Sequence, residues 1–121
     1  MMPTILVIDD DPAILMTIAD ILRDEGYIVR TASSGIAGLV AIDDLLPSLV
    51  LLDMRMPVLD GWGVARTLNE RGVVVPLIAM TAAQDLQWGQ EIGAAHTLAK
   101  PFDLLELLIV VEQVIDQQAI S

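Results

Sequence analysis

Short apolar runs alternate with longer helical patterns five times along this chain. The runs span about residues 5–8, 27–31, 49–52, 74–80 and 95–99. The first is continuous, rich in branched side chains and bounded by polar residues, which is typical of a strand buried on both faces. Regular alternation of strands and helices favours parallel strands joined by right-handed crossovers. We therefore expect an α/β fold with a single doubly wound, five-stranded parallel sheet in flavodoxin-like order 2-1-3-4-5 and helices on both faces.

The segments between the runs contain signals for helix starts. Asp11 directly before Pro12 is typical of an N-cap followed by the first helical residue, and Asp103 can cap the last helix. The helices are expected over about residues 12–25, 35–46, 62–70, 82–92 and 104–117. The fourth of these is the weakest prediction, because Gly89 lies inside it.

The composition sets limits on location and partners. The 121 residues have the length of one domain, here 1–121, with room for a buried core. The absence of cysteine excludes disulfides and thiolate metal sites and suits a cytoplasmic location. The formal net charge is −11 without a basic stripe, so direct binding to nucleic acid or to a membrane is not expected. No apolar run approaches the ~18 residues of a membrane span, and the first residues lack the features of a signal peptide.

Four of the runs end in polar residues suited to phosphate chemistry. These residues are Asp9, Asp10 and Asp11 after the first run, Asp53 after the third, Thr81 after the fourth, and Lys100, the only lysine, after the fifth. The carboxyl ends of neighbouring parallel strands meet at the edge of the sheet where ligands bind, so we expect these groups to converge. Clustered carboxylates repel one another unless a cation compensates them, and a hard divalent cation such as Mg²⁺ is the ordinary solution. Asp10 and Asp53 would be direct ligands, with Asp9 helping directly or through water.

Asp53 is the candidate nucleophile. A carboxylate beside a metal ion can attack a phosphoryl group, and a lysine can neutralise charge on the phosphoryl oxygens. Simpler explanations remain open for single residues: Asp11 as an N-cap, Thr81 as another N-cap, and Lys100 as a solvated charge. The lone histidine, His96, has no local motif that would give it a catalytic or metal-binding role.

Four motifs in this order resemble those of the receiver domain of bacterial two-component response regulators. They are Val-Ile-Asp-Asp-Asp at 7–11, Asp-Met-Arg-Met-Pro-Val-Leu-Asp-Gly at 53–61, Met-Thr-Ala at 80–82 and Lys-Pro-Phe at 100–102. Each motif is weak alone, but the four together, at these spacings, are highly specific. The resemblance covers nearly the whole chain.

The resemblance implies a role for each site residue. Asp53 would be the phosphoacceptor, and Asp9 and Asp10 would hold Mg²⁺ together with Asp53 and the backbone carbonyl of Arg55. Thr81 would bond the phosphoryl group in the active state, and Lys100 would pair with it. The donor would be a phosphohistidine on a sensor histidine kinase or a phosphotransfer protein. Self-phosphorylation from a donor and self-dephosphorylation would then be the only chemistry, without an external product.

Three positions depart from the family pattern or tune it. Many receivers have Tyr or Phe three residues before the lysine, where this chain has Thr97. Because threonine cannot fill the cavity of an aromatic ring, we expect phosphorylation to move the backbone around Thr81 more than the side chain of Thr97. Arg55 could shield the acyl phosphate, and Ala83 offers no group to orient a water molecule, so slow self-dephosphorylation is expected.

The last helix is apolar around nearly its whole circumference. This pattern fits either scattered exposed aliphatic residues or a contact surface that includes Leu105, Ile109 or Val110, together with Trp88 of the preceding helix. Such a surface, formed by the last two helices, could serve a homodimer or contact an output domain.

Two other functions remain open at this stage. A small phosphatase of the haloacid-dehalogenase type also uses an aspartyl nucleophile, and Asp9-Asp10-Asp11 superficially offers its D-x-D pattern. The chain has no room for the cap of such enzymes. A receiver-like interaction module with a dead site is the second alternative, against which the full acidic set and Lys100 argue.

Overall fold

The computed structural model describes residues 2–120 and has one five-stranded parallel sheet in the order β2-β1-β3-β4-β5. The strands are β1 (Thr4–Ile8), β2 (Ile28–Ala32), β3 (Leu49–Asp53), β4 (Leu77–Ala82) and β5 (His96–Lys100). The helices are α1 (Pro12–Asp24), α2 (Gly35–Asp44), α3 (Gly61–Glu70), α4 (Gln87–Glu91) and α5 (Leu104–Ile120), with a 3₁₀ turn, η1, at Ala83–Asp85. The predicted fold class and strand order are confirmed. None of the helices in this part of the chain is long and apolar enough to cross a membrane.

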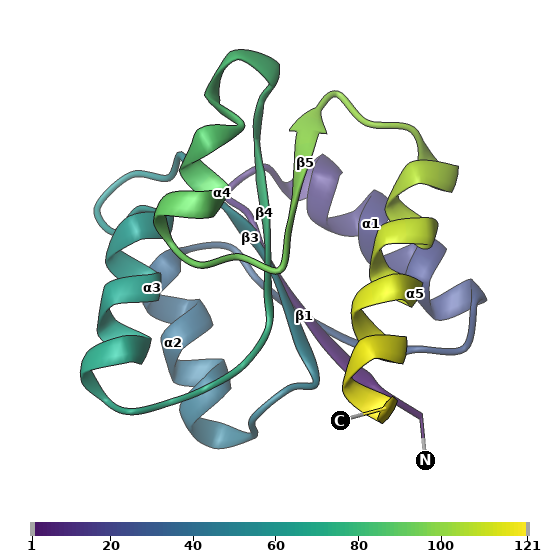
Figure 1. Ribbon diagram of the computed structural model, residues 1–121, viewed down its shortest axis with the longest axis horizontal. Coiled ribbons are helices and arrows are strands. Elements are labelled where there is room, and N and C mark those ends of the chain that lie inside the picture. Colours follow the sequence, from purple (N-terminus) through teal and green to yellow (C-terminus); the bar gives the residue numbers. More distant parts are fainter. Residues whose placement is uncertain (1, 121) are drawn as a thin grey trace.

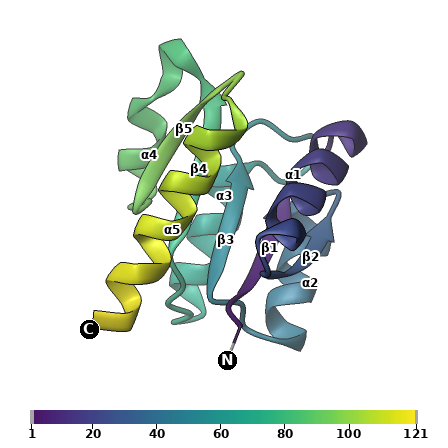
Figure 2. The same cartoon turned by 90° about the vertical axis from the view of Figure 1, so that its right-hand side faces the viewer.

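Two apolar cores cover the two faces of the sheet. Successive strand side chains point to opposite faces, so Ile5 and Val7 pack against α1 and α5, whereas Leu6 and Ile8 pack against α2 and α3. Figures 1 and 2 show α1 and α5 on one side of the sheet and α2, α3 and α4 on the other. All five residues of β3 are buried, because this central strand is covered on both sides.

The helix starts follow the predicted caps. The side chain of Asp11 accepts a hydrogen bond from the backbone N of Ala13 at 2.9 Å, and that of Asp103 accepts one from Glu106 N at 2.7 Å. Asp11 is therefore a helix cap, as its place before Pro12 suggested. The caps fix where α1 and α5 leave the carboxyl edge of the sheet.

Two predicted elements differ most from the structure, whereas the ends of the other elements shift by three residues or fewer. The run at 74–80 was expected to be a strand throughout, but β4 begins at Leu77, and Pro76, which has no backbone N–H, supplies only its carbonyl to Val50 N, at 3.0 Å. The expected helix over 82–92 is wrong. Ala82 ends β4, and the rest divides into η1 and the five-residue α4, neither of which has a side-chain cap at its start.

Gly89 shows why α4 lies where it does. A Cβ atom at this position would be 1.7 Å from Oγ1 and 3.0 Å from Cβ of Thr97 on β5. The helix backbone therefore lies directly against the threonine side chain, with no space for a Cβ atom at position 89.

Gly89→Ala is expected to destabilise the protein by about 2 kcal/mol, because the new methyl group has to displace α4 from β5. Adding Thr97→Ala removes the nearest atom and should recover more than half of the loss. Gly72→Ala is the control, since Gly72 has open space around it and a φ of +68°, so that only backbone strain of about 1 kcal/mol arises. Urea unfolding curves measure all four proteins, and equal losses at both glycines without rescue would contradict the contact.

The apolar surface of α5 is divided between the core and solvent. Its buried residues are Leu107, Val110, Val111 and Val114. Leu105 is 67% exposed and Ile109 is 46% exposed, so these two remain candidates for a contact surface. The inclusion of Val110 was wrong, because this side chain packs against the sheet.

Candidate functional site

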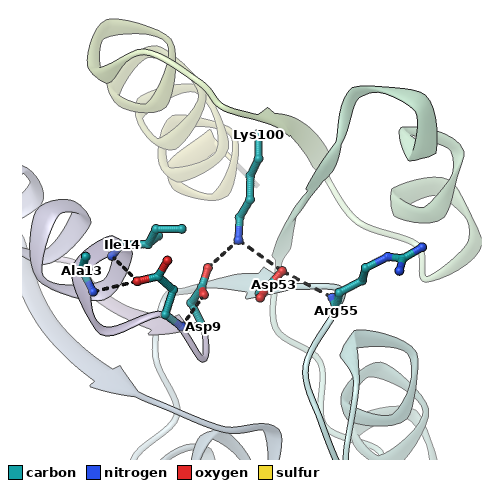
Figure 3. A network of polar contacts seen from close by, with 7 residues as sticks. Asp9, Ala13, Ile14, Asp53, Arg55 and Lys100 are labelled. Carbon is teal, nitrogen blue, oxygen red and sulfur yellow. Dashed lines mark hydrogen bonds and ion pairs between the residues drawn. The ribbon is translucent and has the colours of Figure 1, made fainter.

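The polar residues at the strand ends converge at the carboxyl edge of the sheet. Asp9 follows β1, Asp53 ends the neighbouring β3, Thr81 lies near the end of β4, and Lys100 ends β5. Figure 3 shows the Lys100 side chain descending between the carboxylates of Asp9 and Asp53. A cavity of about 320 Å³, here called the acidic cavity, is lined by these residues together with Asp10, Asp11, Ile14, Arg55 and Ala82.

Lys100 bridges the two buried carboxylates. Its Nζ is 2.7 Å from Oδ2 of Asp9 and 3.3 Å from Oδ1 of Asp53. Asp9 is fully buried, and its other oxygen accepts a hydrogen bond from Asp11 N at 2.9 Å. The peptide bond between Lys100 and Pro101 is cis. Lys100 is therefore not a freely solvated charge.

The electrostatic balance of the cluster disfavours a charged Asp53. Burial first, and then the nearby charge of Asp9, raise the pKa of Asp53, and Lys100 and the backbone N–H of Arg55 lower it; together these effects move it from 3.8 to about 6. For Lys100, burial lowers the pKa, but the hydrogen bond to Asp9 and the charge of Asp53 outweigh burial, so the pKa lies above its usual value. One ammonium group thus compensates its two carboxylate neighbours incompletely.

The acidic residues fit a hard divalent cation. Asp9, Asp10 and Asp53 each offer a carboxylate oxygen, and these oxygens lie within 4.8 Å of one another. Asp10 is exposed while the other two are buried, so the cluster opens to solvent on the side of Asp10. Carboxylate oxygens with room for water are the donors that Mg²⁺ prefers, and a dication would relieve the repulsion that raises the pKa of Asp53.

Thr81 places an unsatisfied hydroxyl group in the acidic cavity. The residue is 4% exposed, and its Oγ1 has no hydrogen-bond partner among the described residues. The explanation of Thr81 as a helix cap is wrong, since η1 has no side-chain cap. A buried hydroxyl without a partner costs free energy unless a ligand or water satisfies it, so this atom is poised to bond something in the cavity.

A cluster of aromatic residues beside the site was not foreseen from the sequence. The ring of Trp62 on α3 meets that of Trp88 on α4 edge-on, with centroids 4.6 Å apart, and the Arg55 guanidinium lies 5.1 Å from the centroid of Trp88. Nε1 of Trp62 donates a hydrogen bond to Oε2 of Glu91 at 3.0 Å. These residues come from three segments, and no local motif links them. His96 is exposed and lies outside the acidic cavity.

Comparisons with known proteins agree with the geometry. Residues 5–112 match the family model of the response regulator receiver domain. The chain is 41% identical over 112 residues to the DNA-binding dual master transcriptional regulator RpaA of Synechocystis sp., and 40% identical over 106 residues to the DNA-binding response regulator MtrA of Mycolicibacterium smegmatis. These matches cover 88% and 86% of this chain but 46% of each relative, so the chain spans about half the length of these curated relatives.

A solved structure extends the likeness to the fold. The response regulator receiver domain protein from Clostridium thermocellum superposes with a TM-score of 0.88 at 31% identity, covering 98% of both chains. The matched residues 5–112 include every strand end that lines the acidic cavity. A phosphatase of the haloacid-dehalogenase type is not favoured by any of these matches. The chain belongs to the family of response regulator receiver domains.

Proposed function

We propose that this chain is a phosphoacceptor signalling domain in which Asp53 receives the phosphoryl group. The observation that supports this most is the composition of the acidic cavity: a buried carboxylate, a lysine ammonium 3.3 Å from it and an unpartnered hydroxyl share one small space. We assign Mg²⁺ to Asp9, Asp10, Asp53 and the backbone carbonyl of Arg55. When bound, the ion supplies positive charge to the phosphoryl oxygens.

The proposed reaction transfers a phosphoryl group from nitrogen to oxygen. An oxygen of the Asp53 carboxylate bonds to phosphorus while the N–P bond of a phosphohistidine breaks, and the electron pair remains on the imidazole nitrogen, which takes up a proton. The product on this chain is an acyl phosphate. The ammonium group of Lys100 then pairs with a phosphoryl oxygen instead of the Asp53 carboxylate, and the Thr81 hydroxyl donates a hydrogen bond to another phosphoryl oxygen.

The proposed partners follow from this chemistry and from the surface. The donor is a sensor histidine kinase or a phosphotransfer protein, in the cytoplasm. Residues 1–121 act as one unit that does not itself bind nucleic acid, in line with its net charge of −11. The exposed Leu105 and Ile109 provide a contact for a second copy or for an output domain.

Removal of the metal is expected to prevent phosphorylation. Incubation with acetyl phosphate and Mg²⁺ should add one acid-stable, alkali-labile phosphoryl group per chain, visible by intact mass, whereas excess EDTA should reduce the addition to background. Added Mg²⁺ should restore it. Steady release of phosphate from small phosphomonoesters, without a labelled chain, would instead support the phosphatase alternative, and the absence of any label would leave only the interaction module with a dead site.

A further inference from the structure

The side chain of Arg55 connects the acidic cavity to α4. Arg55 follows Asp53 by two residues, and its backbone N donates a hydrogen bond to Asp53 Oδ1 at 3.3 Å. Figure 3 shows that its side chain extends away from Asp53 and Lys100. The guanidinium lies 5.1 Å from the centroid of the Trp88 ring on α4. Arg55 thus contacts the proposed phosphorylation site through its backbone and α4 through its side chain.

Two cavities meet at Arg55. It lines the acidic cavity and also a cavity of about 550 Å³ formed with Met54, Met56, Pro57, Asp60, Trp62 and Trp88. Arg55 is exposed, and both cavities adjoin its side chain. The long, flexible stem of arginine allows the guanidinium to turn from one cavity to the other.

We propose that Arg55 is a positioning residue that holds α4 through Trp88 while Asp53 is unmodified, and that it turns to the phosphoryl oxygens when Asp53 is phosphorylated, releasing α4. The inference rests on the proposed function and adds the route by which the state of Asp53 reaches the surface. The transfer from one contact to the other is favourable because an exposed guanidinium over an aromatic ring is weakly held. A paired hydrogen bond to phosphoryl oxygens is charge-assisted and stronger.

α4 is built so that the loss of this contact can move it. The helix has only five residues, too few to be stable by itself, and has no side-chain cap. Its position depends on packing: Trp88 against Trp62, Glu91 bonded to Trp62, and Gly89 against Thr97. Position 97 holds a threonine in contact with Gly89, so there is no aromatic side chain at this position to transmit the phosphorylation state of Asp53. Arg55 provides a route that does not need one.

Intrinsic fluorescence tests this proposal directly, because Trp62 and Trp88 are the only tryptophans of the chain. Beryllofluoride with Mg²⁺ serves as the phosphoryl mimic, and saturation is established for each variant by a thermal-shift titration. In the unsubstituted protein we expect a higher thermal midpoint and a changed tryptophan emission. In Arg55→Met the emission without beryllofluoride should already resemble that of the saturated unsubstituted protein, and the further change on saturation should be less than half as large.

Arg71→Met is the matched control, since it removes an equal charge from an exposed residue that pairs with Asp43 and lines no cavity with either tryptophan, and its emission change should equal that of the unsubstituted protein. Binding of beryllofluoride without any emission change, or the same change in Arg55→Met as in the unsubstituted protein, would overturn the role of Arg55 alone. Absence of any thermal shift in the unsubstituted protein would overturn the proposed function and this inference with it.

Discussion

Asp53→Asn is expected to raise the thermal midpoint of the metal-free protein at pH 8, although it removes the proposed phosphoacceptor. Asp53 is 5% exposed, and burial together with the charge of Asp9 raises its pKa to about 6. At pH 8 the folded protein therefore holds a carboxylate that its surroundings disfavour. Asparagine keeps the size of the side chain without the charge. The same variant should take up no label from acetyl phosphate.

The sign of the effect follows from the direction of the pKa shift. A carboxyl group whose pKa is higher in the folded than in the unfolded chain destabilises the fold when it is ionised. For Asp53 this penalty is complete above about pH 6 and disappears as the pH falls toward 3.8. The difference between the two pKa values corresponds to about 3 kcal/mol. Because the variant also loses an ion pair with Lys100, we expect a net gain of about 1–2 kcal/mol at pH 8.

Thermal midpoints at pH 8 and at pH 4.5, in EDTA, check the direction of this prediction. Urea unfolding curves under the same conditions give the free energy of unfolding. The advantage of the variant should shrink at the lower pH. Asp10→Asn is the control, because Asp10 is exposed and a surface substitution of this kind changes stability by no more than ~0.5 kcal/mol. A variant less stable than the unsubstituted protein at pH 8, or a gain that grows on acidification, would show that Lys100 compensates both carboxylates fully.

The convergence of the site residues could be predicted because its causes are local. Asp53, Thr81 and Lys100 each stand at the end of a short apolar run, and the rules for parallel sheets bring such ends to one edge. The preference for right-handed crossovers limits the possible strand orders, and the flavodoxin-like order chosen among them is the one that the structure has. The structure adds what these rules do not contain, namely that Lys100 contacts both Asp9 and Asp53 and that Thr81 Oγ1 has no partner within the described part of the chain.

The region around α4 could not be predicted because its causes lie far away in the sequence. A helical period over 82–92 gives no sign that Gly89 must fit against Thr97 on β5. The contact between Trp62 and Trp88 depends on how two separate helices pack. Similarly, the uniformly apolar α5 gave no preferred face, and only packing on the sheet decides that Val110 is buried while Leu105 is exposed.

Lys100→Ala is expected to have the opposite effect to Asp53→Asn and to be larger. It leaves Asp9, which is fully buried, and Asp53 without their shared cation. Removing one partner of a buried ion pair typically costs 3–5 kcal/mol, and since the Lys100 side chain is 25% exposed we expect about 2–3 kcal/mol at pH 8 in EDTA. Arg71→Ala is the control, because Arg71 and Asp43 form an ion pair of similar length, 2.9 Å, at the surface. That pair should contribute less than ~1 kcal/mol.

Two further conditions separate loss of charge compensation from loss of packing in Lys100→Ala. Lowering the pH to 4.5 should reduce the loss, because Asp53 is then largely protonated in the folded protein. Adding Mg²⁺ should stabilise the variant more than the unsubstituted protein, since a dication among Asp9, Asp10 and Asp53 replaces the missing positive charge. Thermal midpoints with and without Mg²⁺ provide this comparison. A loss that is the same at both pH values and is unaffected by Mg²⁺ would mean that Lys100 stabilises the fold through its aliphatic stem instead of its charge.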